Sequence, residues 1–232
     1  MGVIHDLGLQ KMICDLHTHT LLSDGVLSPV ELIRRGIVNG YQVIALTDHV
    51  AVGYLRRIIG EVARDCLLAR EQWGIMAVAG VELTHVPAKS IDVAAREAKE
   101  EGAQIVLVHG ETIAEPVEPG TNLAAVASPY VDVLAHPGLI TLEEARLAAT
   151  NGVFLEISAR KGHSLTNGHV ARTAGLVGAK LLLNSDAHDT GDLLTPASAR
   201  AIVRGAGLDD EETEEVLFGN PRLLLAKLKI AG

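Results

Sequence analysis

The chain has 232 residues and a formal net charge of −9, with 48% hydrophobic but only 3% aromatic residues. This acidic balance argues against an extended nucleic-acid surface, which needs clustered lysines and arginines, although a small anionic ligand could still bind a local cationic site. We find no apolar run near the roughly 20 residues of a membrane span and no signal peptide, so we expect a soluble, cytoplasmic protein.

Short apolar runs alternate with amphipathic stretches along the whole chain. Seven runs are predicted to be strands, at residues 12–16, 43–46, 76–81, 105–108, 131–135, 153–157 and 181–183. Helices are predicted between and after them, at residues 28–39, 53–71, 90–102, 167–176, 196–204 and 209–218, with one more that begins at residue 141. This alternation predicts an α/β fold with a parallel sheet or barrel, and the length suits a single domain over residues 1–232.

Two helix starts carry clear local signals. Ser28 precedes a proline at the first helical position, and Thr141 is followed by Glu144 in the pattern of a capping box. Residues 111–121 form the longest irregular segment. Cys14 and Cys66 lack the CxxC spacing and are expected to be buried free thiols.

Residues that commonly bind metals follow most of the predicted strands. His17 and His19 come at the end of the first strand, and residues i and i+2 of a strand point to the same side. Similar residues follow five other strands, namely His49, Glu82, His109, His136, Asp186 and His188. Because functional residues of parallel barrels lie at the carboxyl ends of the strands, the pattern predicts a shared polynuclear metal site.

The order of these motifs resembles that of the PHP (polymerase and histidinol phosphatase) family over essentially the whole chain. The matching segments are Asp15-Leu16-His17-Thr18-His19, Ser23-Asp24-Gly25, Thr47-Asp48-His49, Gly80-Val81-Glu82, His109, His136-Pro137 and Ser185-Asp186-Ala187-His188. The resemblance implies a distorted (β/α)7 TIM-like barrel of the PHP type. It also implies a trinuclear centre that binds up to three divalent ions, whether Zn, Mn or Fe.

The resemblance also implies how the ligands divide among three ions. The first ion would be held by His17, His19, Glu82 and Asp186; the second by Glu82 as a bridge with His109 and His136; and the third by Asp24, His49 and His188. Some relatives have a histidine in place of Asp24. We expect Asp48 to support a ligating histidine, and His85 either to face the site or to lie at the surface. His5 and His169 are interpreted as structural or solvated.

The predicted chemistry is hydrolysis of a phosphoester by a metal-bound hydroxide, with Glu82 and Asp186 as catalytic ligands. Arg160 and Lys161 follow the sixth strand, where a planar guanidinium could bind two phosphate oxygens. His163 could protonate the leaving group. The alternative for these three residues is a solvated turn.

Two other functions compete with this prediction. Amidohydrolase-type barrels also open with His-x-His, but they commonly bridge two metals with a lysine at the end of strand four, where this chain has His109. A non-catalytic scaffold is the other alternative, since barrels resembling this family occur in archaeal ribonuclease P without the metal ligands. The partner expected here is a small phosphomonoester or nucleotide-type phosphoester, and the sequence predicts no oligomeric state.

Overall fold

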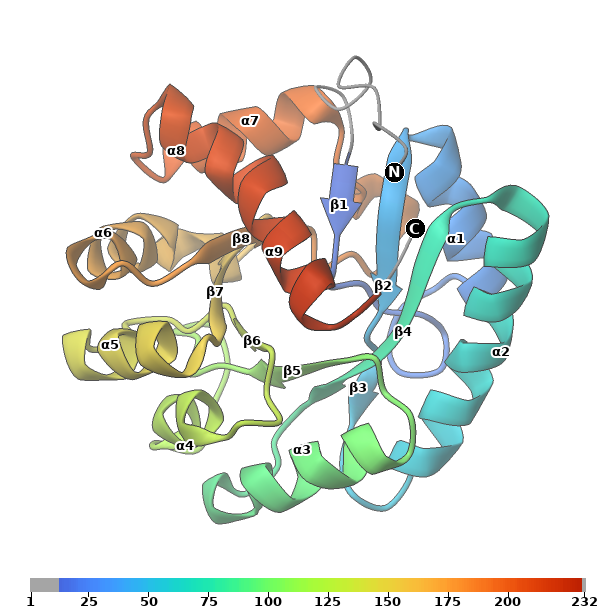
Figure 1. The fold of residues 1–232 in the computed structure, drawn as a ribbon, viewed down its shortest axis with the longest axis horizontal. Helices are drawn as coiled ribbons and strands as arrows, with labels where there is room; N and C mark the ends of the chain where they lie inside the picture. The colour runs from blue at the N-terminus through green and yellow to red at the C-terminus, as the bar shows by residue number, and fades with distance from the viewer. Residues whose placement is uncertain (1–12, 231–232) are drawn as a thin grey trace.

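The computed structural model describes residues 13–230, which form a nearly closed barrel of parallel strands surrounded by helices (Figure 1). Neighbouring strands follow the order β1 (Ile13–Asp15), β2 (Tyr41–Leu46), β4 (Met76–Leu83), β5 (Ile105–His109), β6 (Val133–Ala135), β7 (Phe154–Ser158) and β8 (Leu181–Asn184). A two-residue strand, β3 (His49–Val50), pairs with β4 alone. The predicted α/β barrel with seven strands is confirmed.

The barrel closes just beyond the ends of β1 and β8. The main-chain N–H of Asp186 donates to the oxygen of His17 at 2.9 Å, and the N–H of His19 donates to the oxygen of Ala187 at 2.8 Å. Both bonds involve the motifs that carry candidate ligands. Closure of the barrel therefore brings the first and last of these motifs together.

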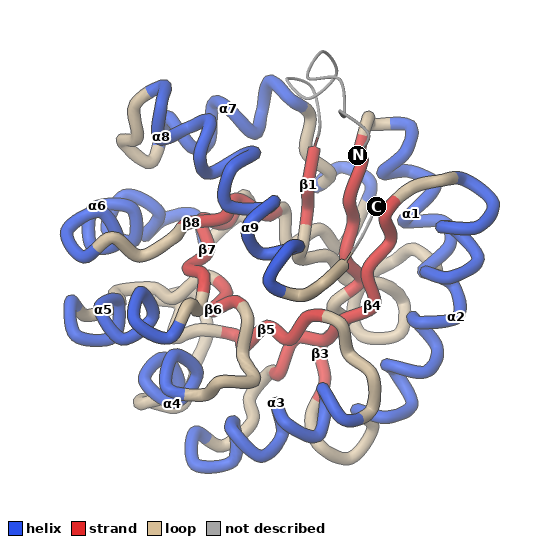
Figure 2. The backbone as a smooth tube through the Cα atoms, in the orientation of Figure 1, coloured by secondary structure: helices blue, strands red, loops and turns tan. Residues whose placement is uncertain are grey.

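Most of the helices surround the ring of strands, whereas the last helix lies across one opening of the ring (Figure 2). The helices are α1 (Pro29–Val38), α2 (Leu55–Trp73), α3 (Ile91–Glu100), α4 (Thr121–Ala127), α5 (Leu142–Asn151), α6 (Asn167–Val177), α7 (Pro196–Gly205), α8 (Asp210–Glu214) and α9 (Asn220–Lys227). The Ser28 hydroxyl accepts from the N–H of Glu31, and Thr141 and Glu144 form the predicted capping box. Within residues 13–230, no helix has the length and apolar character needed to span a membrane.

Three elements differ from the sequence prediction. Strand β3 and helix α4 were not predicted, and helix α4 begins after Gly120 without a side-chain cap, so it lacks the usual local signal. The helix predicted over residues 209–218 continues further than predicted, because a π-helical turn at Glu215–Gly219 joins α8 to α9, which was not predicted. Asn220, the first residue of α9, donates its side-chain amide to the main-chain oxygen of Leu181 and so ties α9 to β8.

Aliphatic side chains fill the barrel interior. They come from every strand of the ring except β1, with Leu16 just beyond it, and are joined by Leu224 and Leu225 of α9. Their partners include Val43, Ile105 and Phe154 at the amino ends of strands, so α9 closes that end of the barrel (Figure 1). Because the interior is packed with apolar groups, polar side chains of the barrel can gather only at the opposite end.

Candidate metal centre

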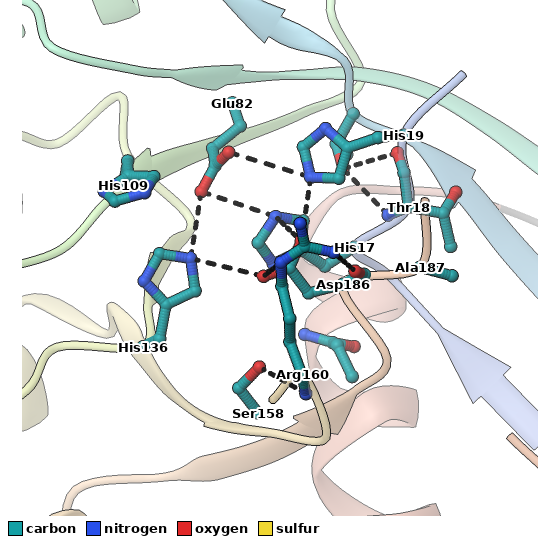
Figure 3. A network of polar contacts seen from close by, with 12 residues as sticks. His17, Thr18, His19, Glu82, His109, His136, Ser158, Arg160, Asp186 and Ala187 are labelled. Carbon is teal, nitrogen blue, oxygen red and sulfur yellow. Dashed lines mark hydrogen bonds and ion pairs between the residues drawn. The ribbon is translucent and has the colours of Figure 1, made fainter. Parts of the chain in front are cut away.

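Candidate ligands from all parts of the chain meet at the carboxyl ends of the strands (Figure 3). The structure brings together His17, His19, Asp24, His49, Glu82, His109, His136, Asp186 and His188. The ring of His19 lies 4.1 Å from that of His49 and 4.2 Å from that of His188, between centroids. The ring of His109 lies 4.5 Å from that of His136.

Unusual backbone conformations aim two of these residues into the centre. His136 and Asp186 have positive φ angles of 26° and 54°, in the left-handed region that side chains other than glycine rarely adopt. Such a conformation costs on the order of 1–3 kcal/mol and persists where the surrounding structure enforces it. Each residue follows the end of a strand, so the bend turns its side chain toward the barrel axis instead of along the outer surface.

The first group of ligand atoms surrounds His17 and His19. Nε2 of His17 lies 3.3 Å from Oε1 of Glu82, and Nε2 of His19 lies 3.1 Å from Oδ1 of Asp186. Ligand atoms of His17, His19 and Asp186 all fall within 4.8 Å of one another. This spacing is compatible with ligands around a single ion.

Glu156 orients His17 and was not singled out as a site residue from the sequence. Its carboxylate is fully buried in β7 and accepts from Nδ1 of His17 at 2.8 Å, from Nδ2 of Asn184 at 2.8 Å and from the main-chain N–H of His136 at 3.3 Å. With Nδ1–H donated to Glu156, Nε2 of His17 presents its lone pair to the centre, as metal-bound histidines commonly do. The sequence signal that could have identified Glu156 is its position as a lone carboxylate in the middle of an apolar strand.

A second group of ligand atoms lies nearer the solvent. It consists of His19, Asp24, His49 and His188, with Oδ1 of Asp24 3.0 Å from Nε2 of His188 and 3.5 Å from Nε2 of His49. Asp24 is the most exposed of the candidate ligands, with 54% of its side chain accessible. His49 is oriented by Thr84, whose hydroxyl lies 2.7 Å from Nδ1.

Asp48 has a different partner from the one predicted. Instead of contacting a histidine ring, its carboxylate accepts from the N–H and hydroxyl of Thr20, at 2.7 and 2.8 Å, and from the hydroxyl of Ser23 at 2.6 Å. These bonds fix the loop that carries Asp24. Asp48 therefore supports the centre through this loop and not through His49.

A third group contains Glu82, His109 and His136. Oε1 of Glu82 lies 3.4 Å from Nε2 of His136, while Oε2 of the same carboxylate lies 2.6 Å from Nδ1 of His49. Glu82 thus touches members of all three groups. Glu82 projects from β4 two residues after Gly80. A Cβ atom at position 80 would collide with Ile105 of β5, so the close approach of these two strands requires a glycine there.

Glu115, in the segment between β5 and α4, is a second residue that sequence reasoning missed. Its Oε2 lies 3.1 Å from Nε2 of His109 and its Oε1 lies 3.5 Å from Nε2 of His163. The contact with His109 lowers the pKa of Glu115 to about 2. The surrounding segment has no regular pattern, so only the three-dimensional structure connects Glu115 to the centre.

Three of the remaining residues singled out from the sequence, His85, Arg160 and His163, line a cavity of about 720 Å³ above the centre. Arg160 lines it and donates to the main-chain oxygen of Asp186 at 3.2 Å, whereas Lys161 is exposed and outside the lining. His163 lines the cavity but is only 4% exposed, and His85 lines it while half exposed. His169 bonds the oxygen of Ile140, a structural role, and His5 lies outside the described residues.

The charges of the centre favour a bound cation. Burial raises the pKa of Glu82, but His17 and His49 beside it lower that pKa well below its usual range, so the carboxylate is ionised. Burial, together with the rings of His49 and His17, lowers the pKa of His19 well below its usual value. Burial lowers the pKa of His17 and of His49, but Glu156 and Glu82 raise that of His17 well above its usual value, and Glu82 raises that of His49. A metal ion bound by these rings would therefore take the place of a proton, since ionised carboxylates and neutral imidazoles are the forms that bind metal ions.

Unpaired polar atoms give a direct test of whether metal ions fit. Six buried side-chain atoms of this centre make no hydrogen bond among the described residues: Nε2 of His17, Nδ1 and Nε2 of His19, Oε1 of Glu82, Nδ1 of His136 and Nε2 of His188. Four of them, all except the two Nδ1 atoms, instead stand 3.0–3.3 Å from another candidate ligand atom. A buried polar atom without a partner costs about 1–3 kcal/mol. Several such lone pairs in one cluster of histidines and carboxylates fit divalent metal ions.

Comparison with known proteins gives the family. Residues 15–159 match the PHP domain, and the chain belongs to the PHP family. An uncharacterized protein of Methanocaldococcus jannaschii is 45% identical over 92% of this chain and 99% of its own length. A probable phosphatase of Thermoanaerobacter sp. (strain X514) is 28% identical over 87% of this chain and 89% of its own length.

Solved structures share the barrel. The histidinol phosphate phosphatase of Lactococcus lactis, crystallised with zinc, L-histidinol and phosphate, has a TM-score of 0.59 at 16% identity and covers 87% of this chain and 95% of its own. A solved amidohydrolase has a TM-score of 0.61 at 14% identity, covering 93% of this chain and 74% of its own. At these identities the likeness establishes the fold alone.

Proposed function

We propose that this protein is a metal-dependent phosphoesterase acting on a small phosphomonoester or nucleotide-type phosphoester at a centre of up to three divalent ions. The observation that carries the proposal is the cluster of unpaired buried ligand atoms at the carboxyl ends of the barrel strands. The PHP-family membership and the relative named as a probable phosphatase support the choice of phosphoesters.

The proposed ligands divide as the family resemblance implies. His17, His19, Glu82 and Asp186 would hold one ion; Glu82 with His109 and His136 a second; and Asp24, His49 and His188 a third. Ions bound there would supply Lewis-acid charge for phosphate oxygens and lower the pKa of a coordinated water. The protein's own contribution is to hold its imidazoles in the correct tautomer, as Glu156 does for His17.

The cavity above the centre supports a small substrate. Its volume of about 720 Å³ lies within the range of small-molecule sites, roughly 300–1,000 Å³. Arg160 lines the wall beside Asp186, where its guanidinium could also bind phosphate oxygens. The general-acid role of His163 stays a prediction, because its Nε2 is directed at Glu115.

A substrate screen with defined metals tests the proposal. The purified protein is assayed with p-nitrophenyl phosphate, bis(p-nitrophenyl) phosphate and nucleoside monophosphates, each with Zn²⁺, Mn²⁺ or Fe²⁺ supplied in turn. We expect turnover of at least one class, loss of turnover with chelator, and recovery when metal returns. Glu82→Ala should empty two ion sites at once, measured by elemental analysis, whereas Glu143→Gln on the exposed first turn of α5 should bind metal normally.

The two competing functions give different results in the same screen. The described residues that line the cavity include no lysine, which disfavours an amidohydrolase with a bridging lysine. Turnover of carboxamides or lactones with no turnover of phosphoesters would nevertheless favour that class. A chain that binds metal but turns over nothing, or one that binds no metal, would favour a scaffold.

A further inference from the structure

Glu115 lies outside the predicted ligand set, yet it brings a carboxylate from the solvent side onto a ring nitrogen of the candidate ligand His109. Its carboxylate is 40% exposed, yet Oε2 lies 3.1 Å from Nε2 of His109, a ring that is itself 2% exposed. Nδ1 of His109 lies 3.2 Å from the main-chain oxygen of Gly110. Nε2 is therefore the ring nitrogen of His109 that faces the centre. Glu115 therefore faces the same nitrogen that would bind a metal ion.

The segment that carries Glu115 is fixed at its base. The Glu111 carboxylate accepts from the main-chain N–H groups of Gly120 and Asn122, both at 2.9 Å. In turn, the side-chain oxygen of Asn122 accepts from the main-chain N–H of Glu111. The amide of Asn122 also donates to the oxygen of Pro137, directly after His136. The segment is thus anchored to a neighbour of a candidate ligand.

Interatomic distances support coordination by Glu115. Ligand atoms bonded to one ion at about 2.0–2.2 Å stand roughly 3.0–3.5 Å apart in octahedral or tetrahedral geometry. The His109–Glu115 distance of 3.1 Å and the Glu82–His136 distance of 3.4 Å both fall in this range. These four residues come from the same side of the centre.

His163 also comes near this position, because ligand atoms of His109, His136 and His163 all fall within 4.8 Å of one another. Its ring stacks on that of His136, with centroids 4.1 Å apart and planes 15° from parallel. A coordinated ion lies close to the plane of each imidazole, so this stacking disfavours coordination of one ion by both rings. His163 instead faces Oε1 of Glu115 at 3.5 Å, and Thr112 holds its Nδ1 at 2.8 Å.

We propose that Glu115 is a further, loop-borne ligand of the ion held by Glu82, His109 and His136, and that His163 positions it. The inference rests on the metal centre of the proposed function. Since the other three ligands are at most 2% exposed, Glu115 is the ligand of this ion that solvent and substrate reach first. Retention of this ion then depends on the segment between β5 and α4.

Metal binding tests the inference without any assay of turnover. Glu115→Gln and Glu115→Ala are compared with Glu118→Gln, a matched control in the same segment whose carboxylate accepts from the N–H of Ala88. Zn²⁺ affinities are measured by competition with a chromophoric chelator, and Co²⁺-loaded proteins are compared by visible absorption. We expect both Glu115 variants to bind one ion at least tenfold more weakly and to change the Co²⁺ spectrum, while Glu118→Gln matches the wild type.

Substitutions of His163 test its positioning role. His163→Gln keeps an N–H donor for Glu115, whereas His163→Leu removes the donor but keeps an apolar side chain against His136. We expect His163→Leu to weaken the same ion and alter the Co²⁺ spectrum, and His163→Gln to restore part of both. Equal affinities and spectra in these two variants would overturn the positioning role.

The outcomes separate this inference from the proposed function. If both Glu115 variants bind every ion with wild-type affinity and spectrum, Glu115 is not a ligand, and the phosphoesterase proposal stands untouched. If the wild-type protein binds no divalent ion, the proposed function itself fails and the inference fails with it. A protein that binds metal through Glu115 but hydrolyses no phosphoester would support the inference and overturn the function.

Discussion

Glu156→Gln is the substitution that most directly tests how the protein prepares the metal centre. Burial raises the pKa of Glu156, but the imidazole of His17 lowers it by more, so that the pKa lies below its usual value. The group is therefore an ionised carboxylate at neutral pH. Its oxygens accept from His17, Asn184 and the main chain of His136. Glutamine has nearly the same shape but a single acceptor oxygen and no charge.

Two effects of known size follow from this change. Loss of the carboxylate partner of a metal-bound histidine typically lowers metal affinity 10–100-fold, or about 1.4–2.7 kcal/mol. Separately, one amide oxygen cannot serve donors that approach both carboxylate oxygens, so at least one buried donor loses its partner. That loss costs about 1–3 kcal/mol of unfolding free energy.

The two effects are measured separately. Calorimetric titration with Zn²⁺ or Mn²⁺ gives the affinity, and urea unfolding of the chelator-treated protein gives the stability, with Glu143→Gln as an exposed control. Circular dichroism checks that the variant folds. A folded Glu156→Gln protein with wild-type metal affinity would refute the idea that Glu156 prepares His17 for a metal ion.

Three further substitutions probe other parts of the site. Asp48→Asn should loosen the loop that carries Asp24 and weaken the most exposed ion site, seen as a lower stoichiometry in elemental analysis; full occupancy would contradict this. Arg160→Ala should lower kcat/KM at least tenfold, about 1.4 kcal/mol, with unchanged metal content, and wild-type kinetics would remove it from substrate binding. Cys66→Ser should keep full activity, because burial raises the pKa of its thiol to about 12 and so disfavours a nucleophilic thiolate; a large loss with metal intact would indicate covalent catalysis.

The sequence predicted those parts of the fold and site that have local signals. Apolar runs and helix caps located the seven strands of the ring and most helices, and the residues after six of the seven strands indicated where the candidate ligands gather. Helix α4 was missed because it has only seven residues and follows a glycine at its N-cap, and α9 because a π-helical turn joins it to α8 without a break in the pattern.

The missed site residues depend on contacts between distant parts of the chain. Glu156 is 139 positions from His17, and no spacing rule connects a strand carboxylate to a histidine so far away. Glu115 lies in a segment without periodicity and meets His163 only after the barrel forms. Strand alternation indicated correctly that Asp48 does not face the ligands, but only the fold shows that the loop at Thr20 covers it.

The cost of the unpaired atoms leads to a last prediction, on stability. Six buried polar atoms of the centre make no hydrogen bond among the described residues, and a buried polar atom left without any partner costs about 1–3 kcal/mol. If divalent ions are their partners, binding must stabilise the folded chain, because ions that bind only the native state shift unfolding by mass action. Chelator should therefore lower the thermal unfolding temperature, and Zn²⁺ or Mn²⁺ should restore it, as followed by circular dichroism. An unfolding temperature that is the same with chelator and with excess metal would mean that these atoms find other partners, and the metal centre would lose its physical basis.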